Sequence, residues 1–520
     1  MAADLLIGLD AGTSVIKAVA FTVEGEQVAC ASVKNRIAHV AQGGVEQDMD
    51  ETWTATAQTL RQLGDQVPDL ARRTAALSVT GQGDGTWLAD AAGRPVAPAW
   101  LWLDARAGQI VEELRRDGTG ERIFRITGTG LNPSNQSGQL IWLKRHRPEL
   151  LARAATAFHC KDWLYLNLTG ERATDPSEAN FTFGDFRTRQ YSDEVLALLD
   201  LAAIRHLLPE QVDGTRHQGR LTAEAARETG LLEGTPVSLA PVDVLCTALG
   251  AGLYEPDRPV GCTILGSTGA HMRLYRNVDA VRLRNQVGYT MVMPAPDTWV
   301  GFMSNMSATL NIDWLLDRAE EVLGAFLPDG GPGREDLLAL MDRRAAEAEP
   351  GRVLFHPFIY EAGERGPFVE PCARAQFLGL TSRVTFFDLM RGVYESLGFA
   401  ARDCYEALDH APCEIRLAGG AARSSTCRRI LAAAVNAPVR LVEREEAGAA
   451  GAAMVAAVAL GIAPSLEAVC RAWVEPSLGA LEAPDPELVA AYGALFPVYR
   501  KGYEAMFDFW RALHGARGGR

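Results

Sequence analysis

One pattern of residues occurs twice in this chain: a short apolar strand, a turn of small residues, and a second apolar strand. The first copy spans residues 5–23 around the turn 10–14, and the second spans residues 259–275 around the turn 266–269. Continuous apolar runs of this length are typical of buried strands. Repetition of the whole unit indicates two structurally duplicated halves, with a boundary near residues 255–259, where Glu-Pro-Asp-Arg-Pro interrupts both patterns.

The segments around the two copies alternate between strand and helix patterns. Residues 27–32 predict a third strand, residues 48–63 a capped helix, and residues 74–80 a buried strand that ends in glycines. The alternation predicts an α/β fold. The longest apolar stretch, residues 447–462, is rich in alanine and shorter than the roughly 20 residues that a bilayer needs, so we expect a buried helix there.

Size and charge exclude several classes of protein. A chain of 520 residues is too long for one core, so two or three domains are expected. The net charge of -14 repels phosphate backbones and anionic membranes, and argues against both as partners. The nine cysteines include no Cys-x-x-Cys pair, and the N-terminus has no basic leader. These features predict a cytoplasmic protein with reduced thiols, without zinc or disulfides.

The turn at residues 10–14 is a candidate phosphate site. Gly12 allows a close backbone approach, and Thr13 and Ser14 add hydroxyls. Asp10, at the end of a buried strand, is placed to hold a hydrated Mg²⁺. Lys17, on the following strand, faces either solvent or phosphate. A plain hairpin with a polar turn is the alternative.

The second half offers two matching turns. Gly266, Ser267 and Thr268 repeat the first turn, and two such turns facing each other would hold the β- and γ-phosphates of ATP. Gly419 and Gly420 precede a predicted helix at 423–435 and would let the backbone approach an adenine ring. Taken alone, a Gly-Ser-Thr-Gly turn is a loop more often than a site, and the alternative for Gly419 and Gly420 is an ordinary strand-to-helix turn.

Asp243 lies between a short apolar strand, residues 237–240, and an apolar helical run at 244–249. This spacing predicts a helix N-cap, where the helix dipole favours a carboxylate. An ionised aspartate there could accept the proton of a substrate hydroxyl during phosphoryl transfer. A simple cap is the plainer interpretation of these residues alone.

Two loops of the first half mix carboxylates, amides and indoles, a combination suited to small polyhydroxylated ligands. Either loop tryptophan could equally belong to the core. The acceptor-binding candidates are Gln82, Asp84, Trp102, Asp104, Arg106, Asn135 and Asp243.

In its ordered set of motifs, the chain resembles the FGGY carbohydrate kinases, within the superfamily of sugar kinases, actin and heat-shock chaperones. The motifs are residues 8–14 (Gly-Leu-Asp-Ala-Gly-Thr-Ser), 46–48 (Glu-Gln-Asp), 80–82 (Thr-Gly-Gln), 102–106 (Trp-Leu-Asp-Ala-Arg), Asp243, 266–269 (Gly-Ser-Thr-Gly), 419–420 (Gly-Gly) and 446–451 (Glu-Ala-Gly-Ala-Ala-Gly). Each motif is weak alone, but their order is specific to the family.

The resemblance implies an α/β protein of two actin-like (ribonuclease H-like) domains with a central interdomain cleft. Residues 1–256 would bind the sugar or polyol, and residues 257–520 would bind ATP. Asp243 matches the family's catalytic base and Asp10 its magnesium-associated carboxylate. The implied nucleotide-binding residues are Gly12, Thr13, Ser14, Lys17, Gly266, Ser267, Thr268, Gly419, Gly420 and Ser424.

Residues 80–87, 100–106 and 159–170 are similar to the members of this family that phosphorylate erythritol. Where glycerol kinases have an arginine and xylulokinases a histidine, this chain has Gly83, and we expect the space to suit a longer polyol. The sequence therefore predicts transfer of the γ-phosphoryl group of ATP to a terminal hydroxyl of erythritol, in carbohydrate catabolism.

Several alternatives stay open at this point. Within the class, the acceptor could be xylulose, ribulose or glycerol. An actin-like nucleotide-switch protein would share the phosphate turns but lack the acceptor loop and base, and a polyol sensor without catalytic activity would need neither aspartate. The oligomeric state is also open, a homodimer being one option.

Overall fold

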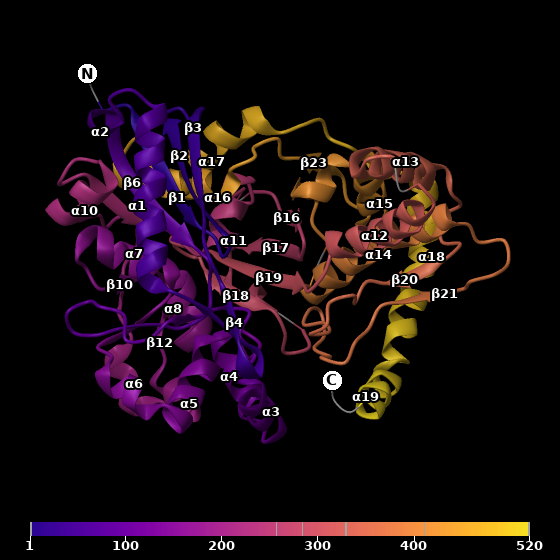
Figure 1. The fold of residues 1–520 in the computed structure, drawn as a ribbon, viewed down its shortest axis with the longest axis horizontal. Helices are drawn as coiled ribbons and strands as arrows, with labels where there is room; N and C mark the ends of the chain where they lie inside the picture. The colour runs from indigo at the N-terminus through magenta and orange to yellow at the C-terminus, as the bar shows by residue number, and fades with distance from the viewer. Residues whose placement is uncertain (1–2, 256, 283, 328–329, 410, 518–520) are drawn as a thin grey trace.

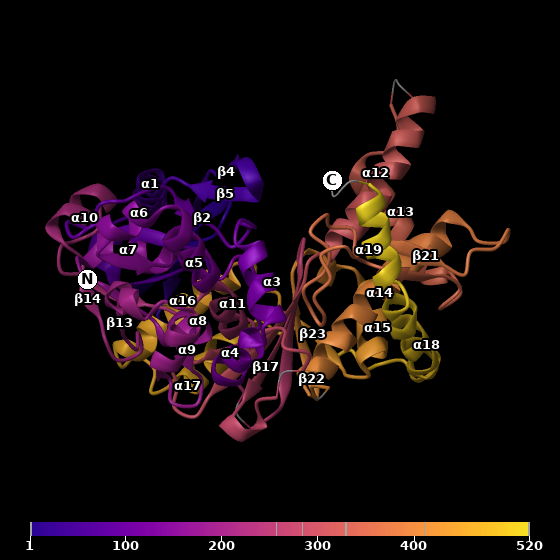
Figure 2. The same cartoon turned by 90° about the horizontal axis from the view of Figure 1, so that it is seen from below.

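The computed structural model describes residues 3–517 except 256, 283, 328–329 and 410, and it contains two lobes, each built on a six-stranded sheet (Figures 1 and 2). The first sheet has the order β14 (Gly219–Arg220), β15 (Pro236–Leu239), β6 (Thr74–Gly81), β1 (Leu5–Ala11), β2 (Val15–Thr22) and β3 (Gln27–Lys34). The second has the order β18 (Tyr289–Val292), β19 (Trp299–Asn305), β17 (Gly269–Tyr275), β16 (Val260–Leu265), β22 (Glu414–Ala418) and β23 (Val439–Leu441).

The two sheets repeat one topology. In the first, β3, β2 and β1 form an antiparallel meander, and β6 and β15 add parallel to β1. In the second, β19, β17 and β16 form the meander, and β22 and β23 add in parallel. The predicted α/β class and the duplication of the strand–turn–strand unit are therefore confirmed.

Helices cover the sheets where the periodicity predicts them. The helix expected from residue 48 is α1 (Met49–Gln66), and Asp48 caps it by accepting a hydrogen bond from the backbone N–H of Glu51. Other helices that carry the argument below are α8 (Pro176–Phe183), α11 (Asp243–Gly250), α12 (Thr309–Phe326), α14 (Phe386–Ala407), α15 (Ser425–Val435), α16 (Ala447–Ala459) and α17 (Leu466–Val474).

Helix α16 belongs to the second half of the sequence but packs against the first lobe, as both views show. A Cβ atom added at Gly8 in β1 would lie 1.9 Å from the Ala449 carbonyl oxygen, and one at Gly250 in α11 would lie 2.0 Å from that of Ala447. Only hydrogen fits at these two positions, so glycine allows the backbones to touch. The apolar run predicted as a buried helix is thus confirmed, and it joins the lobes.

Among the residues that the structure describes, no helix combines the length and the apolar character needed to cross a membrane.

Candidate active site

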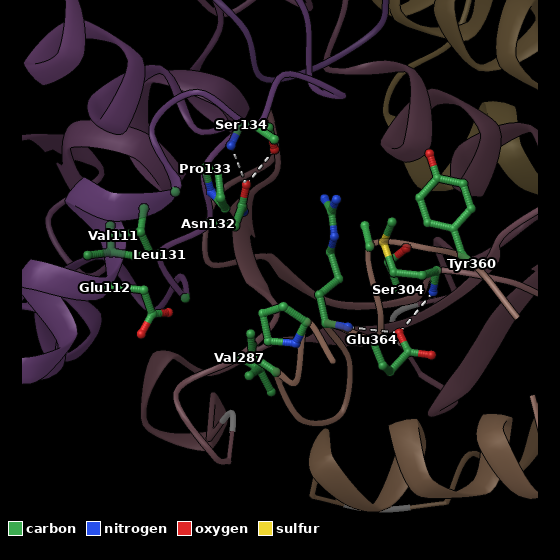
Figure 3. A pocket seen from close by; sticks show the side chains of 18 of the residues that line it. Val111, Glu112, Leu131, Asn132, Pro133, Ser134, Val287, Ser304, Tyr360 and Glu364 are labelled. Atoms are coloured by element: carbon green, nitrogen blue, oxygen red, sulfur yellow. Dashed lines mark hydrogen bonds between the residues drawn. The ribbon is translucent and has the colours of Figure 1, made fainter. Parts of the chain in front are cut away.

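A cleft of about 710 Å³ separates the lobes and is lined by both of them. Figure 3 shows Asn132, Pro133 and Ser134 of the first lobe facing Val287 and Glu364 of the second. The cleft also reaches Asp104 and Tyr289, near the loops expected to bind the acceptor. A central cleft between the lobes is therefore present, as expected from the sequence, but neither Asp10 nor Asp243 is among the described residues that line it.

The two aspartates expected to carry the chemistry lie close enough to interact. Burial raises the pKa of Asp243 well above its usual value, and the charge of Asp10 raises it further. Burial likewise raises the pKa of Asp10 to about 6, although the Lys17 ammonium lowers it. Burial makes each of them a stronger base than a free aspartate, and for Asp243 the neighbouring carboxylate of Asp10 adds to this effect.

Local structure explains how these aspartates are held. Asp10 is the next-to-last residue of strand β1, and a Cβ atom at Gly448 in α16 would come within 2.3 Å of its Oδ2 atom. Asp243 is the first residue of α11, so the N-cap is Val242 and the predicted cap position is wrong by one residue. The Asp243 Oδ1 atom accepts a hydrogen bond from the N–H of Val244 at 2.7 Å.

The first turn is linked to the acceptor loops by its hydroxyl. The indole Nε1 of Trp102 donates to Thr13 Oγ1 at 2.8 Å, and Thr13 Oγ1 donates to Gln82 Oε1 at 3.0 Å. The carbonyl oxygens of Gly12 and Ser14 accept hydrogen bonds from the side chain and backbone of Asn35. Gly12, Thr13, Gln82 and Trp102 are thus part of one bonded network.

The Lys17 side chain is partly exposed, and its ammonium is paired with an acidic residue. Its Nζ atom forms an ion pair with Glu446 at 2.8 Å, and Glu446 immediately precedes α16. The ion pair therefore links β2 to the helix that joins the lobes.

The second-lobe turns lie side by side at the ends of two neighbouring parallel strands. Gly419, with φ 95°, is packed so that a Cβ atom would lie 2.5 Å from the Leu265 carbonyl oxygen. The turn after β16, which contains Ser267 and Thr268, is anchored to the start of α12. The backbone carbonyl oxygen of Ser267 accepts a hydrogen bond from the N–H of Ala308 at 2.7 Å. A Cβ atom at Gly420 would meet nothing within 4 Å, so open space adjoins the turn formed by Gly419 and Gly420.

Gly266 and Ser424 complete the predicted nucleotide set. The Gly266 carbonyl accepts the N–H of Thr309 at 3.0 Å. Ser424 caps α15 by accepting the N–H of Cys427 at 3.0 Å, and its hydroxyl also donates to Asp342. Ser424 is therefore already engaged in the helix cap.

Asp84 is bound from both lobes. Its Oδ1 atom accepts from Asn135 Nδ2 at 2.9 Å, and its Oδ2 atom accepts from the Tyr289 hydroxyl at 3.0 Å. That hydroxyl also accepts from Asn132 Nδ2 at 2.7 Å. Tyr289 lies in β18 of the second lobe, and nothing in its local sequence indicated a link to the acceptor loop.

Asp104 and Arg106 bind each other. The Arg106 Nε atom donates to Asp104 Oδ2 at 2.9 Å, Nη1 donates to Glu46 at 2.8 Å, and the guanidinium lies 3.4 Å from the centre of the Trp100 ring. Asp104 Oδ2 also accepts the N–H of Val45 at 2.9 Å. Asp104 is buried and Arg106 is largely buried, and because both are engaged, they fix the loop that carries Trp102.

The expectation that Gly83 leaves room for a longer polyol is wrong. A Cβ atom there would lie 2.5 Å from Val242 Cγ2 and 3.2 Å from Glu178 Oε1. The space that a larger residue would take is filled by protein, because the acceptor loop packs directly on the residue before Asp243. Glu178, which no motif singled out, is a further buried group beside the site.

The comparisons with known proteins identify a family for both halves of the chain. Residues 5–250 match the N-terminal domain, and residues 261–460 the C-terminal domain, of the FGGY family of carbohydrate kinases. The chain is 51% identical to the erythritol kinase of Brucella abortus over 98% of both chains. It is 30% identical to the xylulose kinase of Escherichia coli, over 96% of this chain and 99% of that one.

Solved structures share the fold over the whole chain. The crystal structure of xylulose kinase from Rhodospirillum rubrum has a TM-score of 0.85 at 27% identity, covering 98% of this chain and 100% of that one. Gluconate kinase from Lactobacillus acidophilus has a TM-score of 0.88 at 22% identity, covering 98% and 99%, which bears on the fold alone. With both domains matched and a relative that shares half of its residues, the chain belongs to the FGGY family of carbohydrate kinases.

Proposed function

We propose that this carbohydrate kinase transfers the γ-phosphoryl group of ATP to a terminal hydroxyl of erythritol, giving erythritol phosphate for catabolism. The observation that carries the proposal is the 51% identity, over 98% of both chains, to a relative named erythritol kinase. The relative named xylulose kinase is 30% identical, which makes a ketose the second candidate.

In this proposal Asp243 accepts the proton of the attacking hydroxyl. Burial, and after it the negative charge of Asp10, raises the pKa of Asp243, so the carboxylate takes a proton more readily than an exposed aspartate does. Because Asp243 begins α11, the helix start also fixes the direction of its carboxylate. In phosphoryl transfer the protein contributes by positioning the reactants and accepting a proton, and it forms no covalent bond to them.

The carboxylate of Asp10 is suited to hold a hydrated Mg²⁺. Its side chain makes no hydrogen bond to any residue within the described ranges. The lone pairs of its carboxylate oxygens are therefore available to a metal ion and its bound waters. Mg²⁺ bound there would neutralise charge on the β- and γ-phosphates. Thr13 and Ser14 lie in the turn that follows Asp10, and Lys17 supplies a nearby positive charge.

We assign ATP to the second lobe and the acceptor to the first. Gly266, Ser267 and Thr268 would hold the phosphates, and the open space beside Gly420 would take the adenine. Gln82, Asp84, Trp102 and Asn135 would bind acceptor hydroxyls, with Asp104 and Arg106 supporting them. This assignment divides the chain at residue 256, with Tyr289 contributing to the acceptor loop from the other side.

We place the protein in the cytoplasm, since all nine cysteines are free, as in reducing compartments. We treat a homodimer as a proposal to be checked by its solution mass.

A coupled assay of ADP release over erythritol, xylitol, glycerol, xylulose and ribulose, with mass analysis of the product, tests the function. We expect the highest kcat/KM with erythritol and a product heavier by one phosphoryl group. A higher kcat/KM with a ketose or with glycerol would replace erythritol as the acceptor. ADP release that does not depend on any acceptor would favour a nucleotide switch instead.

A further inference from the structure

Two adjacent residues at the start of α8 contact two separate parts of the proposed active site. Glu178 Oε1 accepts a hydrogen bond from the backbone N–H of Asp84 at 3.1 Å. Ser177 Oγ accepts one from the backbone N–H of Val242 at 3.2 Å, and Val242 immediately precedes Asp243. Both side chains are fully buried, so neither one touches a substrate.

Glu178 is itself held rigidly. The Nζ atom of Lys161 lies 3.0 Å from Glu178 Oε2, 2.8 Å from Asp175 and 2.6 Å from Asp162. His159, Asp162 and Glu178 have the spacing of a metal site, but the lysine ammonium already supplies the positive charge there. A buried lysine with three carboxylates is a costly arrangement to break, because removing one partner leaves a buried charge.

The three segments that meet here cannot move independently. A Cβ atom at Gly83 would approach both Val242 and Glu178, at 2.5 and 3.2 Å. The acceptor loop, the first turn of α8 and the start of α11 are therefore in contact at one point. A displacement of α8 would shift the acceptor loop and the proposed base together.

We propose that Glu178 and Ser177 are positioning residues with separate tasks. Glu178 fixes the acceptor loop through the amide of Asp84, and Ser177 fixes the base through the amide of Val242. The inference rests on the roles proposed above for Asp84 and Asp243. It adds a device that sets the distance between the bound hydroxyl and its proton acceptor.

The two tasks predict different kinetic effects. Ser177→Ala removes the bond to Val242 and should lower kcat about tenfold with little change in the acceptor KM, since misplacing a catalytic group costs rate. Glu178→Gln keeps the size of the side chain but leaves only one acceptor oxygen. That oxygen cannot serve both Asp84 and Lys161, so the acceptor KM should rise about tenfold while the ATP KM stays unchanged.

Thr182→Val is the matched control. Thr182 is buried on the same helix, and its hydroxyl has no hydrogen-bond partner, so both kinetic constants should equal those of the wild type. Each variant is measured with whichever acceptor the wild type uses best. A wrong substrate assignment therefore does not affect the comparison.

Amide hydrogen exchange of the full-length protein gives a readout independent of turnover. Glu178→Gln should speed exchange in residues 82–86, and Ser177→Ala should speed it in residues 242–244, relative to Thr182→Val. Unchanged exchange in both segments would overturn the proposal, even if wild-type turnover is absent. So would two variants that change kcat and KM in the same proportion.

Discussion

Replacing Asp10 by asparagine should remove activity and yet stabilise the protein. The pKa of Asp10 is raised from 3.8 to about 6 by burial, which means that the folded state disfavours the charged carboxylate. Each pKa unit corresponds to ~1.4 kcal/mol, so ionised Asp10 destabilises the fold by up to about 3 kcal/mol at pH 8. Asparagine has the same shape without the charge, and it relieves the repulsion of Asp243 as well.

The sign of this effect depends on pH. A carboxyl whose pKa is raised by folding contributes stability fully below its unfolded pKa, and that contribution is lost as pH rises through the folded pKa. The stability advantage of Asp10→Asn should therefore be absent near pH 4, grow up to about pH 6, and stay constant above pH 7. We expect the melting temperature to rise by several degrees at pH 8.

The assay is thermal unfolding in EDTA from pH 4.5 to 8, paired with ADP release in the presence of Mg²⁺. Asp4→Asn is the matched control, because Asp4 begins the same segment of chain but its pKa is lowered by Arg73. That variant should not be stabilised at pH 8, and should keep its turnover. If Asp10→Asn melts lower than the wild type at pH 8, or differs from it equally at every pH, the buried charge of Asp10 does not destabilise the fold.

Three further predictions address other parts of the site. Asp243→Asn should lower kcat by about 10²–10⁴-fold while ATP binding, measured by calorimetry, persists; unchanged turnover would remove Asp243 as the base. Tyr289→Phe leaves one oxygen of Asp84 without its donor across the lobes, and should lower the acceptor kcat/KM about tenfold at constant ATP KM. Gly419→Ala forces a side chain into φ 95° and against Leu265, at a cost of at least about 1 kcal/mol, and should raise the ATP KM; an effect on the acceptor KM alone would contradict the nucleotide assignment.

The strands and turns could be predicted because their signals are local. The apolar runs that became β1, β2, β16 and β17 are short and bounded by small residues, and the repeat placed them in equivalent positions. The pairing of these strands into two like sheets followed from that repeat. The family motifs predict that Asp10 and Asp243 share one site, and in the structure the charge of Asp10 acts on Asp243.

Contacts that join distant segments were missed. The ion pair of Lys17 with Glu446 spans most of the chain, and the approach of Tyr289 to Asp84 depends on how the lobes meet. Glu178 lies in a short helix without periodicity that would mark it as functional. The expectation of free space at Gly83 is wrong because the absence of a side chain does not indicate which neighbouring residue fills the space.

The packing of α16 has a consequence for synthesis of the protein. The surface of β1 and α11 that this helix covers is made early on the ribosome, but α16 itself, beginning at residue 447, emerges almost two hundred residues after α11 ends. During that interval the surface around Gly8 and Gly250 that α16 will contact is not yet covered by this helix. The nascent first lobe can therefore complete its core only when the chain is nearly finished, which makes the two lobes unsuitable for expression as separate fragments.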